Sequence, residues 1–104
     1  MADLTQQEWI TKLEADNNAV VLDVRTPEEV AQGIIPNAKH IDIFKGQGFI
    51  DEVQQLDKTK TYFVYCKAGA RSGQACAVMN QLGFNQTYNL LGGFGQWQGE
   101  VSSL

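Results

Sequence analysis

Hydrophobic and polar residues along the chain follow two periodicities in turn, and each periodicity predicts one type of element. Short apolar runs rich in β-branched and aromatic residues are typical of buried strands, whereas apolar residues three or four positions apart indicate one face of a helix. The expected strands are residues 19–24, 40–43, 61–65 and 87–91. The expected helices are residues 5–13, 26–33, 49–56 and 72–82.

Two of the expected helices begin with the same local signal. Thr5 is followed three residues later by Glu8, which is the spacing of a capping box. Thr26 and Glu29 repeat this spacing at the second helix. Pro27 strengthens the second start, because the fixed φ of proline suits the first position of a helix.

Strands that alternate with helices favour the α/β class, in which helices cover both faces of a sheet. We therefore expect a three-layer α/β/α architecture with a central, mainly parallel sheet, and a single domain over residues 1–104. In such sheets, ligands bind at the carboxyl ends of the strands. The segments that follow Val24 and Tyr65 are therefore the expected places for a site.

The loop after Tyr65 carries the clearest chemical signal. It consists of Cys66, Lys67, Ala68, Gly69, Ala70, Arg71 and Ser72. Small residues let backbone N–H groups turn inward, and the start of the next helix adds partial positive charge, so the loop is expected to form an anion cradle. The cradle and the charges of Lys67 and Arg71 are expected to lower the pKa of the Cys66 thiol and favour the nucleophilic thiolate.

The residues of this loop and its helix also allow structural interpretations. An isolated cysteine that ends a strand is more often a buried apolar residue, but that interpretation leaves the basic, glycine-containing loop around Cys66 unexplained. Lys67 alone is also compatible with a solvated surface charge, whereas Arg71 at a helix start is expected to face an anion. Cys76 lies on the apolar face of the helix 72–82 and is expected in the core rather than as a resolving thiol.

Three polar residues near the expected site are better explained by structural roles. Arg25 could help to anchor a substrate, but we expect it to pair with an acidic neighbour such as Glu28 or Glu29. Asp23 is expected to bind loop amides. We do not assign His40 as a general base, because the cradle supplies thiolate without one.

Composition and charge narrow the possible partners. The chain has 8 Lys and Arg against 12 Asp and Glu, a net charge of −4, which argues against nucleic acid but allows a local pocket for a small anion. It contains no apolar run near the roughly 18 residues that cross a bilayer and no signal core, so we expect no membrane partner and a cytoplasmic location. Its two cysteines are expected to be free thiols that, with one histidine, do not form a usual zinc ligand set. A monomer is the default expectation.

The sequence of the loop resembles that of the rhodanese family, whose loop is close to C-x-x-G-x-R/T-S. Four further segments are similar to elements of that family in the same order: LDVRTPEE (22–29), GIIPNAKHI (33–41), LGF (82–84) and LLGGFGQW (90–97). Two positions depart from the family, which often has His where this chain has Ile34 and Gly where it has Asn37. We expect Ile34 to pack in the interior and Asn37 to adopt a left-handed conformation.

The resemblance implies a rhodanese-like fold and a thiosulfate sulfurtransferase that needs no metal or organic cofactor. Cys66 would take the outer sulfur of a donor such as thiosulfate as a persulfide, and a thiol or cyanide acceptor would then remove it. The N–H groups of residues 67–72 would hold the persulfide, while Lys67 and Arg71 orient the anionic donor.

Two alternatives to this reaction remain open. One is a carrier that receives the persulfide sulfur from one protein and passes it to another, with little turnover of thiosulfate. The other is an oxyanion reductase or phosphatase, which is less favoured because related phosphatases and reductases have one more residue between Cys and Arg than the four that separate Cys66 from Arg71.

Overall fold

The fold is built on one five-stranded parallel sheet, seen in a computed structural model that describes residues 2–104. The strand order is β1-β5-β4-β2-β3, and every neighbouring pair is parallel. The strands are β1 (Ala2–Leu4), β2 (Ala19–Asp23), β3 (Lys39–His40), β4 (Thr61–Tyr65) and β5 (Thr87–Leu90). The helices are α1 (Gln6–Ala15), α2 (Pro27–Val30), α3 (Gln47–Val53) and α4 (Ala70–Gln81), with short 3-10 helices η1 (Ile43–Lys45) and η2 (Phe94–Gln96).

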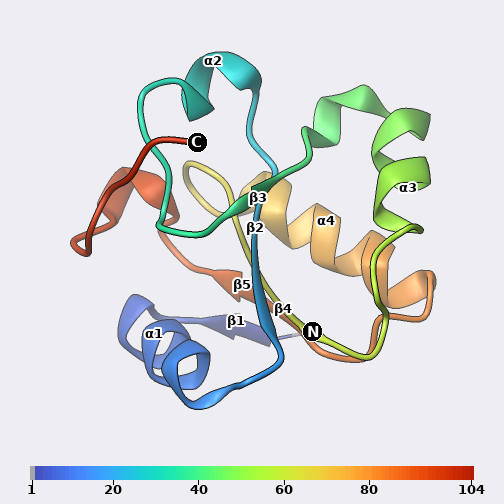
Figure 1. The fold of residues 1–104 in the computed structure, drawn as a ribbon, viewed down its shortest axis with the longest axis horizontal. Helices are drawn as coiled ribbons and strands as arrows, with labels where there is room; N and C mark the ends of the chain where they lie inside the picture. The colour runs from blue at the N-terminus through green and yellow to red at the C-terminus, as the bar shows by residue number, and fades with distance from the viewer. Residues whose placement is uncertain (1) are drawn as a thin grey trace.

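Helices lie on both faces of the sheet, so the predicted three-layer α/β/α architecture is confirmed (Figure 1). The helix residues buried against one face come from α3 and α4: Phe49, Val53, Ala75, Cys76 and Met79. On the opposite face, Trp9 of α1 and Val30 of α2 enter a second core. No helix in residues 2–104 is long and apolar enough to cross a membrane.

Trp9 is the centre of the core on the α1 face. Its side chain has no exposed surface. Its ring makes edge-on contacts with Phe63, Tyr65 and Trp97 at centroid distances of 5.7, 6.3 and 5.9 Å. Its Nε1 donates a hydrogen bond to the carbonyl oxygen of Tyr88 at 3.3 Å. These contacts fix α1 against β4 and β5.

Both predicted capping boxes are present. The N–H of Thr5 donates to Glu8 Oε1 at 2.9 Å, and the N–H of Glu8 donates to Thr5 Oγ1 at 3.3 Å. At α2, the corresponding bonds between Thr26 and Glu29 measure 3.1 and 3.3 Å. Each box satisfies N–H groups that the first turn of a helix leaves without partners.

Several elements differ from the sequence-based prediction. The expected strand 40–43 is limited to Lys39–His40, because Ile43 already begins the 3-10 helix η1, and the expected helix 49–56 is Gln47–Val53. β1 was not predicted, because its three residues form no apolar run and it becomes a strand only by pairing with β5. The helix α4 begins at Ala70, two residues earlier than predicted, because Gly69 adopts a left-handed conformation (φ 108°) that turns the chain into the helix at once.

The two positions that depart from the family pattern behave as expected. Ile34 is 3% exposed and packs in the core on the α1 face. Its backbone also forms an isolated antiparallel bridge with Ser102. Asn37 has φ 69°, the left-handed conformation predicted for it.

Candidate active site

The sulfur of Cys66 lies at the carboxyl end of β4, directly before the start of α4. Cys66 is 1% exposed, and its Sγ accepts a hydrogen bond from the N–H of Gly69 at 3.0 Å. The hydroxyl oxygen of Ser72, in the first turn of α4, lies 3.3 Å from the same sulfur. The loop therefore bends around the sulfur and directs hydrogen-bond donors at it, as expected of an anion cradle.

The pKa of the Cys66 thiol lies below its ordinary value. Burial raises this pKa, but hydrogen bonds from the Ser72 hydroxyl and from the N–H groups of Ser72, Gly69 and Ala68 lower it by more. The direction is the one expected from the sequence. The largest lowering contributions are hydrogen bonds from the loop itself, and a Coulombic interaction also couples the thiolate to the charge of Arg71.

The two basic side chains of the loop have different surroundings. Arg71 donates from Nη1 and Nη2 to the two carboxylate oxygens of Glu29 at 2.6 and 2.9 Å. The anion that faces Arg71 is thus a side chain of α2. Hydrogen bonding to Arg71 lowers the pKa of Glu29 to about 2. Lys67 is exposed and takes part in no ion pair within residues 2–104, so its charge remains available to a ligand.

Arg25 is buried next to the loop, and its predicted partners were wrong. Its guanidinium binds Asp23, with Nη2–Oδ2 at 2.7 Å and Nε–Oδ1 at 3.0 Å, rather than Glu28 or Glu29. Residues two apart in extended backbone lie on the same side of the chain, which explains this pairing. Nη2 also donates to the carbonyl oxygen of Gly33 at 2.8 Å. The expectation that Asp23 binds a loop amide is confirmed by its bond of 2.9 Å from the N–H of Arg25.

His40 is engaged with the backbone at the end of β2. Its Nε2 lies 2.7 Å from the carbonyl oxygen of Arg25, which can only accept a hydrogen bond. That ring nitrogen is therefore a donor and has no lone pair for a proton. Within residues 2–104, no hydrogen bond joins His40 to Cys66.

A small cavity lies beside the loop. Its volume is about 210 Å³. It is lined by Arg25, Glu29, Gln32, Lys67, Phe94 and Gly95. The ring of Phe94 stacks on Tyr65 at 6.0 Å and lies 4.3 Å from the guanidinium carbon of Arg25. Because Arg25 is already paired, Lys67 is the lining residue whose positive charge can meet a small anion.

The segment after β5 holds the outer side of the loop, which sequence reasoning did not foresee. The N–H of Phe94 donates to the carbonyl oxygen of Cys66 at 2.8 Å, and the N–H of Gly95 donates to that of Lys67 at 2.9 Å. A Cβ atom on Gly93 would lie 2.5 Å from both of these carbonyl oxygens, so only glycine fits there. The adjacent glycines after β5 were the available signal for this close approach.

Asn89 of β5 binds the loop through its side-chain amide, and the sequence analysis did not predict this role. Its Nδ2 donates to the carbonyl oxygen of Gly69 at 3.1 Å and to Asp3 Oδ1 at 2.9 Å. Its Oδ1 lies 2.5 Å from the hydroxyl oxygen of Ser72. The signal in the sequence was an amide side chain inside a predicted buried strand, where a polar group needs partners.

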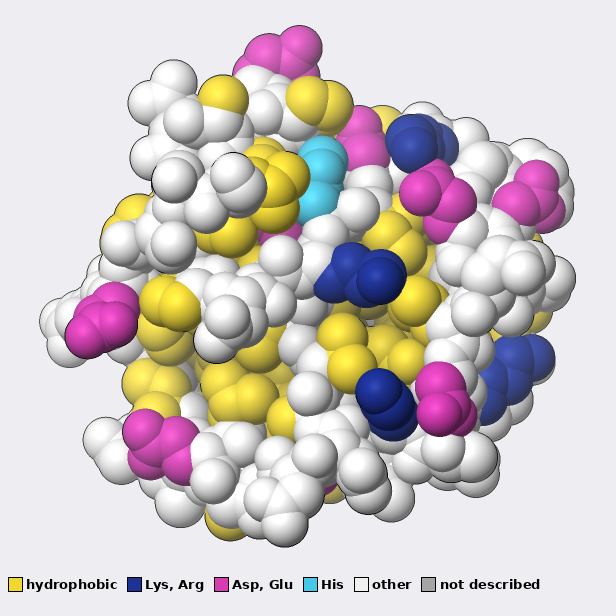
Figure 2. All heavy atoms as spheres, in the orientation of Figure 1, with side chains coloured by type: hydrophobic (Ala, Val, Ile, Leu, Met, Phe, Trp, Pro, Cys, Tyr) yellow, Lys and Arg dark blue, Asp and Glu magenta, His cyan; other side chains and the backbone are white. Residues whose placement is uncertain are grey.

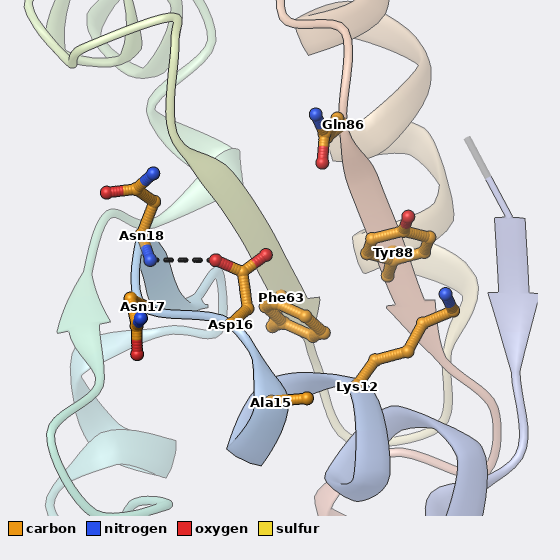
Figure 3. A pocket seen from close by; sticks show the side chains of 8 residues that line it. All are labelled: Lys12, Ala15, Asp16, Asn17, Asn18, Phe63, Gln86 and Tyr88. Atoms are coloured by element: carbon orange, nitrogen blue, oxygen red, sulfur yellow. Dashed lines mark hydrogen bonds between the residues drawn. The ribbon is translucent and has the colours of Figure 1, made fainter.

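A larger hollow of about 470 Å³ lies at the other end of the sheet (Figure 3). There Lys12 of α1 reaches over the ring of Tyr88 at 5.3 Å, and Asp16 accepts a hydrogen bond from the N–H of Asn18 at 2.7 Å (Figure 3). These residues adjoin the amino ends of β2 and β5, whereas Cys66 follows the carboxyl end of β4. The hollow is therefore separate from the site.

The chain is similar to known proteins over most of its length. The family model of the Rhodanese-like domain matches residues 6–100. The protein YtwF of Bacillus subtilis is 43% identical over 91 residues, which cover 86% of this chain and 84% of YtwF. The thiosulfate sulfurtransferase GlpE of Pseudomonas paraeruginosa is 35% identical over 83 residues, which cover 80% of this chain and 73% of GlpE.

Solved structures give the same result. The crystal structure of a rhodanese-like domain protein from Staphylococcus aureus superposes with a TM-score of 0.84 at 30% sequence identity. The alignment covers 100% of this chain and 99% of that protein. With the match of the family model over most of its length, the chain belongs to the rhodanese family and is a sulfurtransferase of that type.

Proposed function

We propose that the protein moves sulfane sulfur from thiosulfate, or a similar small anionic donor, to a thiol or cyanide through a persulfide on Cys66. The observation that carries this proposal is the set of hydrogen-bond donors around the sulfur of Cys66. Sγ receives the N–H of Gly69 at 3.0 Å at the ligand-binding end of the sheet, and its pKa is lowered by the loop's donors. A thiolate held among N–H groups is both a nucleophile and a place where an anionic sulfur is stabilised.

The first half-reaction loads the cysteine. The Cys66 thiolate attacks the outer sulfur of thiosulfate and forms a new S–S bond. The original S–S bond of thiosulfate breaks, and sulfite leaves with the bonding electron pair. The negative charge now lies on the terminal sulfur of the persulfide, where the N–H groups of residues 67–72 can bind it.

The second half-reaction unloads the cysteine. A nucleophilic acceptor attacks the terminal sulfur, and the electrons of the S–S bond return to Cys66 as thiolate. Cyanide leaves as thiocyanate, and a thiol acceptor leaves as a persulfide. Two separate half-reactions predict ping-pong kinetics.

The two basic residues of the loop serve this reaction in different ways. Lys67 is exposed beside the small cavity and attracts and orients the anionic donor. Arg71 is bound by Glu29, so its main effect is to hold the start of α4 in place. The orientation of a donor by Arg71 itself would require the carboxylate of Glu29 to share the guanidinium.

Mass spectrometry after treatment with thiosulfate tests the proposal. The protein is expected to gain one sulfur atom and to lose it when cyanide is added. Cys66→Ser should gain none. Cys76→Ser is the matched control and should load normally, because Cys76 is buried in the core and burial raises its pKa to about 12. A wild-type protein that acquires no sulfur from any sulfane donor would exclude the mechanism.

A second candidate function is sulfur transfer between proteins. Its support is the exposed side chain of Phe44, which is 69% exposed and whose ring centre lies 5.6 Å from the guanidinium carbon of Arg71. Lys and Arg side chains lie among apolar side chains on the part of the surface where α3 and α4 run (Figure 2). An apolar residue exposed beside the loop suits a macromolecular acceptor better than a small one.

Steady-state kinetics distinguish the two functions. Rapid turnover of thiosulfate with cyanide supports the small-molecule reaction. Loading of Cys66 with slow turnover, together with fast transfer to a protein thiol, supports the carrier. Phe44→Ser should slow only the transfer to a protein.

We also propose a cytoplasmic location. Both cysteines are unpaired, which suits a reducing compartment. Fractionation of the cells that produce the protein tests this, with recovery from a membrane or secreted fraction as the opposing result.

A further inference from the structure

The hydroxyl of Ser72 lies between two groups that both need its hydrogen. Its oxygen is 3.3 Å from Cys66 Sγ and 2.5 Å from Asn89 Oδ1. A serine hydroxyl carries one hydrogen, so it can donate to only one of them at a time. Ser72 is fully buried, so bulk water does not reach its hydroxyl to replace either partner.

The side-chain amide of Asn89 is fixed in one orientation. Both hydrogens of Nδ2 are used, one by the carbonyl oxygen of Gly69 and one by Asp3 Oδ1. Reversal of the amide would place Oδ1 against these two oxygens, neither of which carries a hydrogen to donate. Oδ1 must therefore face Ser72, and as a carbonyl oxygen it can only accept.

We propose that Asn89 is a positioning residue that competes with the sulfur of Cys66 for the hydroxyl hydrogen of Ser72. In the thiol form, Cys66 S–H donates to Ser72 Oγ, and Ser72 donates to Asn89. When the thiolate forms, the hydroxyl rotates and donates to sulfur, and Asn89 Oδ1 loses this donor. Asn89 thus makes ionisation of Cys66 harder than the loop alone would make it.

The same competition predicts where the hydroxyl hydrogen of Ser72 points in the persulfide. Once Cys66 carries a second sulfur, the charge lies on the terminal atom and Sγ is neutral. The hydrogen of Ser72 then returns to Asn89. This consequence rests on the proposed function, whereas the competition itself concerns only the free thiol.

The charged groups around the loop are the same in each state. The elements packed there contribute two ion pairs, one hydrogen-bonded carboxylate and one exposed cation: Arg71 with Glu29, Arg25 with Asp23, Asp3 with the amide of Asn89, and Lys67. Replacement of Asn89 by leucine changes none of these charges, but it also removes the hydrogen bonds from Nδ2 to Gly69 and Asp3. The comparison with the Ser72→Ala background therefore isolates the contribution of the hydroxyl.

Titration of the thiol in variants tests the proposal. The rate of alkylation is measured against pH in a Cys76→Ser background, so that only Cys66 reacts. Asn89→Leu should lower the pH midpoint by roughly one unit, because the hydroxyl then donates to sulfur alone. Ser72→Ala should raise the midpoint, and Asn89→Leu should have no further effect in the Ser72→Ala background.

Several results of this titration would overturn the proposal. A residue with only a structural role would give no shift or an upward shift when replaced, because a displaced loop loses donors. Either result, or the same downward shift in the Ser72→Ala background, overturns the proposal. None of these measurements needs a sulfur donor, so they are independent of whether thiosulfate is a substrate.

A measurement on the unaltered side chain covers the case in which Asn89→Leu does not fold. The ¹³C chemical shift of the Asn89 side-chain carbonyl should follow the titration of Cys66, because this oxygen loses a hydrogen bond as the thiolate forms. In Ser72→Ala the same signal should not respond to that titration. A carbonyl shift that is independent of pH in the wild-type protein contradicts the proposal.

Discussion

Glu29 binds Arg71 through two hydrogen bonds of 2.6 and 2.9 Å and at the same time caps α2 through Thr26. One carboxylate thus satisfies the start of one helix and fixes the first turn of another. The start of α4 is the side of the cradle that holds Cys66. The position of the loop therefore depends on a residue that does not touch the sulfur.

Acidification is expected to weaken the fold through Glu29. Hydrogen bonding to Arg71 lowers the pKa of Glu29 from 4.5 to about 2. A carboxyl whose pKa falls on folding stabilises the protein above its unfolded pKa, and that stabilisation is lost as the pH drops through the folded pKa. Because the pair is partly exposed, the loss between about pH 5 and pH 2 should be about 1 kcal/mol. Urea unfolding at several pH values should show this loss in the wild-type protein and not in Glu29→Gln; parallel profiles would contradict it.

Removal of the charge of Lys67 should weaken binding of the donor. Lys67→Ala is expected to raise KM for thiosulfate roughly threefold to tenfold with little change in kcat, because an exposed cation contributes about 1 kcal/mol to binding an anion. The difference from wild type should shrink at high salt. Lys60→Ala is the control, since Lys60 precedes β4 at the end opposite Cys66. Equal effects of the two variants would show that only net charge matters.

The buried pair of Asp23 and Arg25 should be sensitive to the loss of one partner. Asp23 is 0% exposed and Arg25 is 3% exposed. Asp23→Ala leaves a buried guanidinium without its carboxylate and should lower the free energy of unfolding by about 3–5 kcal/mol. The double variant Asp23→Leu with Arg25→Met should recover much of that loss, because neither charge remains. A single variant with nearly wild-type urea unfolding would rule out this account.

Trp9 should be the most costly residue to truncate in α1. Trp9→Ala removes a fully buried ring and three aromatic contacts, and should cost about 3–5 kcal/mol. Trp9→Phe keeps part of the ring volume but loses the hydrogen bond to Tyr88, so its loss should be smaller. Thermal unfolding followed by circular dichroism measures both. If the two variants are equally unstable, packing volume is not what Trp9 contributes.

The elements that carry the site could be predicted because their signals are local. A few adjacent residues are enough to predict the strand 61–65 and the capping boxes of Thr5 and Thr26. The structure has these elements at the predicted positions. The edge strand β1 could not be predicted in this way. Its three residues are extended because β5 lies beside them, and β5 begins more than eighty residues later.

The same distinction applies to the candidate site. The position of Cys66 follows from the order of strand, loop and helix. The partners of the charged residues do not, because Glu29 and Arg71 are 42 residues apart and Asp3 and Asn89 are 86 apart. For Arg25, the sequence offered three nearby carboxylates, and only the direction of the side chains at the end of β2 selects Asp23.

The carbonyl oxygens of Cys66 and Lys67 are held from outside by the backbone of Phe94 and Gly95. The direction of these peptide groups is therefore set by main-chain contacts and does not depend on the exposed side chains at positions 67, 68 and 70. Changes of those side chains are therefore expected to leave these peptide groups in place. If Cys66 carries sulfur as proposed, the main chain of the loop supplies the chemistry and its exposed side chains face the donor, so selectivity can evolve while the reaction is retained.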